Sequence, residues 1–129
     1  ISGNSGSDLS LSDDTLSAVR AGMKGVTSDD GGTAYTYFKD FNIEVGGKTG
    51  SASNDNSGNA NAWFIGFAPF NDPEIVFVGV VYDGGHGGFI APTAKAVYEQ
   101  YFKDRILASN PTYTFTKYIS EIPSDNKSK

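Results

Sequence analysis

Two nearly uninterrupted apolar runs, residues 62–68 (AWFIGFA) and 74–82 (EIVFVGVVY), constrain the fold of this chain more than any other feature. Their aromatic and β-branched residues favour β-strands. Only the five residues from Pro69 to Pro73 connect the two runs, so we expect an antiparallel pair. Because both faces of each strand would be apolar, the sequence predicts that helices cover the sheet on both sides.

Two helices are predicted to supply that cover. The first begins after Ser12, which can cap it, and ends in the loop 28–32. The second runs from about Pro92 to about Leu107 and has a wide apolar face. Residues 33–41 (TAYTYFKDF) fit either a short helix or an extended approach to the next strand. The apolar residues of the first helix share one face: Leu16, Val19, Met23 and Val26.

Composition excludes several classes of function. The 129 residues carry a net charge of −5, with a pI near 4.6, and no basic cluster that would favour nucleic acid. The absence of cysteine excludes disulfides and thiolate catalysis, and the single His86 argues against a Ser-His-Asp triad within the chain. No apolar run approaches the roughly 20 residues of a transmembrane helix. The chain begins at Ile1 without a signal peptide, so we expect it to start inside a longer natural protein.

The residues best suited to bind a ligand or take part in a reaction are Lys48, Thr49, Gly50 and Ser51. We expect them at the end of a strand that begins near Ile43. Lys48 offers a cation to a carboxylate, and Thr49 and Ser51 offer hydroxyl groups. Gly50 lacks a Cβ, so a ligand can lie directly against the strand backbone. A strand edge also presents N–H groups to a peptide-like ligand. A K-T-G tripeptide alone is weak evidence, and a lysine near a turn is its simpler interpretation.

The order of the surrounding stretches is more specific. L-S-D-D-T-L-S-A-V-R-A-G-M-K-G-V and G-G-T-A precede G-G-K-T-G-S-A, which is followed by A-W-F-I-G-F-A-P, V-V-Y-D-G-G-H-G-G and A-P-T-A-K-A-V-Y-E-Q-Y-F. This order resembles the C-terminal part of a class B penicillin-binding protein, a monofunctional D,D-transpeptidase that cross-links bacterial peptidoglycan. The resemblance covers about residues 9–103. The motif set of penicillin-binding proteins and class A β-lactamases is S-x-x-K, S-D-N and K-T-G.

The first two motifs of that family are not recognisable here. No S-x-x-K precedes Lys48, and Ser124 with Lys127 matches the spacing only in the polar tail. S-x-N occurs at residues 2–4, 57–59 and 124–126, but the family places it further upstream of K-T-G than any of these. We interpret all these matches as coincidence. The resemblance therefore implies a partial transpeptidase domain whose nucleophilic serine lies on a segment outside these residues.

The resemblance also implies a mechanism and a set of site residues. In this family the serine attacks the penultimate D-Ala carbonyl of a stem peptide, and the amine of a second stem peptide resolves the acyl-enzyme. β-Lactams mimic D-Ala-D-Ala and acylate the same serine. By position, Lys48 and Ser51 would be catalytic: Lys48 would set the electrostatics and the proton relay, and the Ser51 N–H would be one of two oxyanion-hole donors. Thr49, Gly50 and Ser51 would bind substrate, the two hydroxyls holding its carboxylate, and no metal or cofactor is implied.

The implied fold class is α+β, with an antiparallel sheet sandwiched by helices, of which this chain supplies the last three strands and the C-terminal helix. Residues 1–111 would be the C-terminal portion of the transpeptidase domain, and 112–129 a partly disordered tail with a short strand at 112–116 left open. The strand 74–82 would keep an unpaired apolar edge unless a missing strand completes it, so we expect the chain to be unstable alone.

The implied partners are the remaining N-terminal part of the domain, peptidoglycan stem peptides and β-lactam antibiotics, with no nucleic acid. The implied location is the outer side of the bacterial cytoplasmic membrane, with an anchor on an N-terminal segment not in this chain. A serine β-lactamase, a β-lactam sensor domain that is acylated once, and a fragment with a purely structural role remain as rival functions.

Other conspicuous residues have simpler interpretations. His86, among four glycines, is expected to be a loop residue rather than a ligand or general base, in a loop that emerges at the same sheet end as residues 51–61. Trp63, Phe64 and Phe67 are expected in the core and the cleft wall. The acidic pairs at 13–14 and 29–30 are interpreted as helix-start and loop residues rather than metal ligands.

Overall fold

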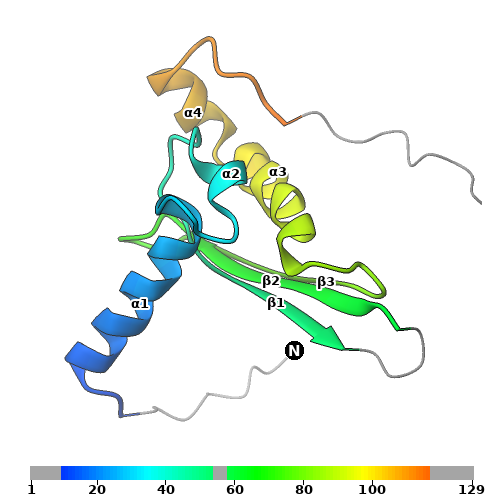
Figure 1. Ribbon diagram of the computed structural model, residues 1–129. Coiled ribbons are helices and arrows are strands. Elements are labelled where there is room, and N and C mark those ends of the chain that lie inside the picture. Colours follow the sequence, from blue (N-terminus) through cyan, green and yellow to red (C-terminus); the bar gives the residue numbers. More distant parts are fainter. Residues whose placement is uncertain (1–9, 54–57, 117–129) are drawn as a thin grey trace, which may run out of the picture.

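A computed structural model of the chain describes residues 10–53 and 58–116 (Figure 1). These residues form helices and one antiparallel sheet, as the sequence predicted. No helix within them is long and apolar enough to span a bilayer. The elements in chain order are α1 (Asp13–Ser28), α2 (Tyr35–Phe38), β1 (Gly46–Ser53), β2 (Ala60–Ala68), β3 (Ile75–Val81), the short 3₁₀ helix η1 (Gly87–Ile90), α3 (Ala91–Tyr101) and α4 (Lys103–Ser109).

The sheet has the order β1-β2-β3, and both pairings are antiparallel. The pairing expected from the short 69–73 connection is therefore confirmed. In the central strand β2, Ile65 lies opposite Lys48 of β1 and Val78 of β3. Among the described residues β3 pairs only with β2, so its outer edge is free.

Helix α1 begins where its capping signal predicted. The Ser12 side chain accepts a hydrogen bond from the Thr15 backbone N–H at 3.2 Å, which satisfies one of the free donors of the first turn. On the predicted apolar face, Met23 and Val26 are partly buried, whereas Leu16 and Val19 are exposed. The described residues therefore cover only the C-terminal half of this helix.

The prediction of the second helix is wrong in one respect. Instead of one helix over 92–107, the chain forms α3 and α4, which are separated at Phe102, where φ is −97° and ψ is 15°. Both Phe102 and Ile106 are buried in the core. The buried residues Ala94, Tyr98, Phe102 and Ile106 keep the i, i+4 spacing across this break, which is why the apolar pattern predicts one helix and does not reveal the interruption. The ambiguous stretch 33–41 contains the short helix α2, which places Phe38 in the core.

The hydrophobic core lies between the sheet and the helices α2 and α3, which cover one face, while α4 follows α3 farther from the sheet (Figure 1) and adds Ile106 to the core. The Phe38 ring packs 6.1 Å from the ring of Phe64 on β2 and 6.3 Å from the ring of Tyr98 on α3. Every second residue of β2 from Ala62 to Ala68 faces this side and is buried, and Phe64 and Ala68 belong to the core. We call this side of the sheet the covered face.

Helix α1 lies on the other side of the sheet, where its C-terminal end meets the start of β1 (Figure 1), and covers only part of it. The Arg20 guanidinium lies 5.2 Å from the ring centre of Phe67 and donates a hydrogen bond to the Phe70 carbonyl. Away from this contact, the apolar side chains that β2 and β3 present on the α1 side of the sheet are mostly exposed. The predicted helix–sheet–helix layering is present, but its second cover is incomplete in the described residues. We call the exposed set the open face: Trp63, Ile65, Val76 and Val78.

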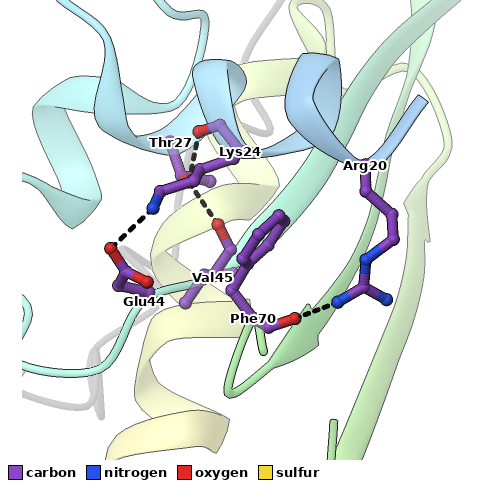
Figure 2. Close-up of polar contacts among 6 residues, drawn as sticks. All are labelled: Arg20, Lys24, Thr27, Glu44, Val45 and Phe70. Atoms are coloured by element: carbon purple, nitrogen blue, oxygen red, sulfur yellow. Dashed lines mark hydrogen bonds and ion pairs between the residues drawn. The ribbon is translucent and has the colours of Figure 1, made fainter. Parts of the chain in front are cut away.

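Polar contacts tie α1 to the residues that lead into β1 (Figure 2). The buried Thr27 hydroxyl lies 2.5 Å from the Val45 carbonyl and donates to it, immediately before β1 begins. Lys24 and Glu44 form an ion pair at 2.8 Å, which adds at most about 1 kcal/mol because both side chains are solvated. The backbone just ahead of Lys48 is thus held by a buried hydrogen bond to α1.

The residues after α4 are held by one buried carboxylate. Glu99 accepts hydrogen bonds from the Tyr113 hydroxyl at 2.8 Å and from the Thr116 backbone N–H at 2.7 Å. Burial, and then the bond to Glu99, raises the pKa of the Tyr113 phenol. The strand left open for 112–116 does not form, and residues 117–129 lie outside the described residues. The domain boundary after residue 111 stays a prediction.

Candidate active site on strand β1

The K-T-G-S segment lies inside β1 rather than at the end of a strand. The small, polar composition of residues 51–61 is typical of a loop, but the strand continues to Ser53 and β2 begins at Ala60. Small, polar residues can pair in a ladder when the partner strand supplies the apolar surface, which is why composition alone misplaced this boundary. Residues 54–57 lie outside the described residues.

Strand alternation divides the four residues between two faces. Lys48 and Gly50 pair with Ile65 and Trp63, so they share the open face with these two side chains. Thr49 and Ser51 pair with Phe64 and Ala62 and point to the side of α3 and η1. Because β1 is an edge strand in this sheet, both pairs of residues lie beside a free edge.

Lys48 is exposed, and its Nζ donates a hydrogen bond to the Thr49 carbonyl at 2.6 Å. Within the described part of the chain no carboxylate forms an ion pair with it. Its positive charge is therefore available to an anionic ligand at the edge of β1. The structure does not bury this ammonium group in the core.

Thr49 is buried, and its hydroxyl lies 2.7 Å from the hydroxyl of Thr33. Thr33 comes from the segment between α1 and α2, and the sequence analysis gave it no role. The only available signal was its position in G-G-T-A, quoted as part of the family pattern. The Thr49 hydroxyl is thus already hydrogen-bonded within the protein, so its contact with substrate stays a prediction.

Ser51 is exposed, and its Oγ accepts a hydrogen bond from the backbone N–H of Gly87 at 3.0 Å. Gly87 begins η1, after the loop that leaves β3. This contact, with the bond from Gly85 N–H to the Ala60 carbonyl at 2.8 Å, confirms that the 83–88 loop lies at the sheet end where β1 finishes and β2 starts.

His86 is a loop residue with a local structural role, as predicted. Its Nδ1 accepts a hydrogen bond from the Gly88 N–H at 3.1 Å and so caps η1. The acidic pair Asp13–Asp14 lies in the first turn of α1, as expected from the helix dipole. Across residues 10–53 and 58–116, no three His, Asp or Glu side chains come together as a set of metal ligands.

Comparison with known proteins assigns the family. Residues 5–103 match the family model of the penicillin-binding protein transpeptidase domain. The chain is 30% identical over 104 residues to the peptidoglycan D,D-transpeptidase MrdA of Haemophilus influenzae, covering 69% of the chain but only 16% of that relative.

Two solved structures show the same fold. PBP2 of Pseudomonas aeruginosa, in complex with WCK 5153, matches 91% of the chain and 25% of its own length, with 28% identity and a TM-score of 0.69. The D,D-transpeptidase domain of a peptidoglycan glycosyltransferase from Eggerthella lenta matches 75% of the chain and 22% of its own length, with 33% identity and a TM-score of 0.60. The chain thus spans a quarter or less of these proteins. It belongs to the penicillin-binding protein transpeptidase family, and within that family to the class B type predicted from its sequence.

Proposed function

We propose that this chain forms the K-T-G side of a D,D-transpeptidase active site that cross-links peptidoglycan stem peptides and is acylated by β-lactams. The observation that carries the proposal is the edge strand β1, on which Lys48, with no ion pair among the described residues, lies three residues before the exposed Ser51. The nucleophilic serine and its S-x-x-K lysine belong to a segment outside these 129 residues. Without that segment the chain is inactive.

The proposed roles follow from the chemistry of acyl transfer. Lys48 attracts the anionic terminus of the stem peptide and supports proton transfer at the attacking serine. Thr49 and Ser51 bind the substrate carboxylate through their hydroxyls, and Gly50 leaves room for the peptide against the strand. The Ser51 N–H donates to the developing oxyanion, a contribution whose loss typically slows such reactions about 100- to 1,000-fold.

The open face supports the proposal that other parts of the domain are needed. Trp63, Ile65, Val76 and Val78 form a contiguous apolar surface on two neighbouring strands, of the kind that normally lies at an interface. The remaining N-terminal part of the transpeptidase domain is the proposed cover. We place the whole enzyme at the outer face of the bacterial cytoplasmic membrane, held by an N-terminal anchor.

Labelled penicillin tests the function in the complete transpeptidase. We expect a long-lived covalent adduct, and we expect Lys48→Ala to slow its formation about 100-fold or more. Lys103→Ala is the matched control, because Lys103 is an exposed lysine on α4 and should leave the rate unchanged. Rapid hydrolysis of the adduct would instead favour a β-lactamase, and an adduct without turnover of D,D-peptides would favour a sensor. Equal rates in Lys48→Ala and the control would remove the proposed role of Lys48.

A further inference from the structure

The loop after β3 turns back across the sheet end and reaches β1. Two residues of the turn have positive φ, Asp83 at 55° and Gly85 at 75°. The Gly85 N–H bonds to the Ala60 carbonyl, and His86 then caps η1 through the Gly88 N–H. These contacts set the position at which Gly87 meets the K-T-G-S segment.

Gly87 contacts the backbone of Gly50 directly. A Cβ on Gly87 would lie 2.7 Å from the Gly50 nitrogen and closer still to the Gly50 carbonyl oxygen. Both partners are backbone atoms of a paired strand, so no flexible side chain can move aside. Glycine is therefore required at position 87 because a side chain there would overlap the Gly50 backbone. The backbone conformation is not the reason, since the φ of Gly87 is not in the left-handed region.

The close packing of Gly87 on Gly50 places the Gly87 backbone nitrogen 3.0 Å from the Ser51 Oγ, which accepts a hydrogen bond from the Gly87 N–H. A serine hydroxyl has two acceptor lone pairs and one proton. With one lone pair engaged by Gly87, the hydroxyl proton must point away from that N–H. Gly87 is buried whereas Ser51 is exposed, so the directions left to the proton lead toward a ligand at the edge of β1.

We infer that Gly87 is a positioning residue: its N–H holds the Ser51 hydroxyl as a hydrogen-bond donor to the carboxylate of the substrate or β-lactam. The inference rests on the proposed function, in which Ser51 binds that carboxylate. Donation to an anion is stronger than donation to a neutral acceptor, so fixing the direction of this one proton favours ligands that keep the carboxylate.

The test compares acylation of the complete transpeptidase by one β-lactam as its free acid and as its methyl ester. In Gly87→Ala, whose Cβ displaces the β1 backbone at Gly50, we expect both compounds to react more slowly and the acid to lose about tenfold more than the ester. In a Ser51→Ala background, which keeps the oxyanion N–H, the same Gly87 substitution should slow acid and ester equally, within about twofold. Gly22→Ala on α1 is the matched glycine control, because its Cβ meets no atom within 4 Å.

Equal slowing of acid and ester by Gly87→Ala, or the same acid-to-ester difference in both backgrounds, would overturn the inference and leave Gly87 with only a packing role. Amide hydrogen exchange checks the Gly87–Ser51 hydrogen bond without an acylation reaction and without the Gly87 variant. Exchange at the Gly87 N–H should become faster in Ser51→Ala, and unchanged exchange would overturn the inference. A wild-type enzyme that is acylated by neither compound would overturn the proposed function itself.

Discussion

The two faces of β2 differ in cover although their side chains are equally apolar. Phe64 is 1% exposed under the layer of α2 and α3, whereas its neighbour Ile65 is 44% exposed on the opposite side. Both residues belong to the same short apolar run. The difference shows that apolar sequence identifies a surface to be buried, while the elements that bury it can lie in another part of the protein.

The largest expected effect concerns the stability of the whole chain. We predict that the 129-residue chain by itself shows no cooperative unfolding transition as a monomer, because the open face and the free edge of β3 remain in water. Circular dichroism during heating, with sedimentation to establish the oligomeric state, measures this. A sharp melt of a monomer would show that the covered face alone stabilises the fold.

The next effect tests the covered face. In the complete transpeptidase we expect Phe64→Ala to lower the free energy of unfolding by about 3–5 kcal/mol, because the ring packs against Phe38 and Phe77 and leaves a cavity. Urea unfolding measures the change. A loss below about 1 kcal/mol would contradict the packing of this face.

A matched substitution tests the open face in the same protein. If the rest of the domain covers it, Ile65→Ala should cost about 2 kcal/mol or more, as for a buried residue. In the described residues Ile65 has no such cover. A cost under about 0.5 kcal/mol, measured by the same urea unfolding, would mean that the face stays in water and that another role must be found for it.

The pH dependence of stability provides a smaller effect on the covered side. Burial raises the pKa of the Tyr98 phenol above its usual value of about 10, and the Phe77 backbone opposes the rise only in part. Above pH 10 the unfolded chain loses this proton while the folded chain keeps it. Stability should therefore be intact below pH 10 and fall above it, by at most about 1.4 kcal/mol per pH unit from this group. A free energy of unfolding that stays constant from pH 9 to pH 11 in denaturant titrations would contradict the raised pKa of Tyr98.

The smallest expected effect is that of Tyr98→Phe at neutral pH. Within residues 10–53 and 58–116 the buried Tyr98 hydroxyl has no hydrogen bond of normal geometry, so its removal leaves no partner there unsatisfied. We expect the free energy of unfolding to stay the same or rise by up to about 1 kcal/mol, and the fall above pH 10 to become shallower. A loss of more than 1 kcal/mol would show that the hydroxyl has a stabilising partner in the complete enzyme.

Sequence patterns that act over a few residues predicted their structures well. The Ser12 cap, the acidic first turn of α1 and the antiparallel pairing through the 69–73 connection all formed as expected. The K-T-G-S segment was predicted at the end of a strand, but the strand continues two residues beyond Ser51. Strand ends depend on the partner strand, which local composition does not specify.

The sequence by itself determined that 62–68 and 74–82 become strands and that a helix begins after Ser12, because residue composition and capping act over neighbouring residues. Only the tertiary structure decided how the site residues are oriented. The Thr33–Thr49 and Gly87–Ser51 hydrogen bonds join residues 16 and 36 positions apart. It also decided which face of β2 is covered and where the last helix bends at Phe102. These features depend on the packing of distant elements against one another, which no short stretch of sequence contains.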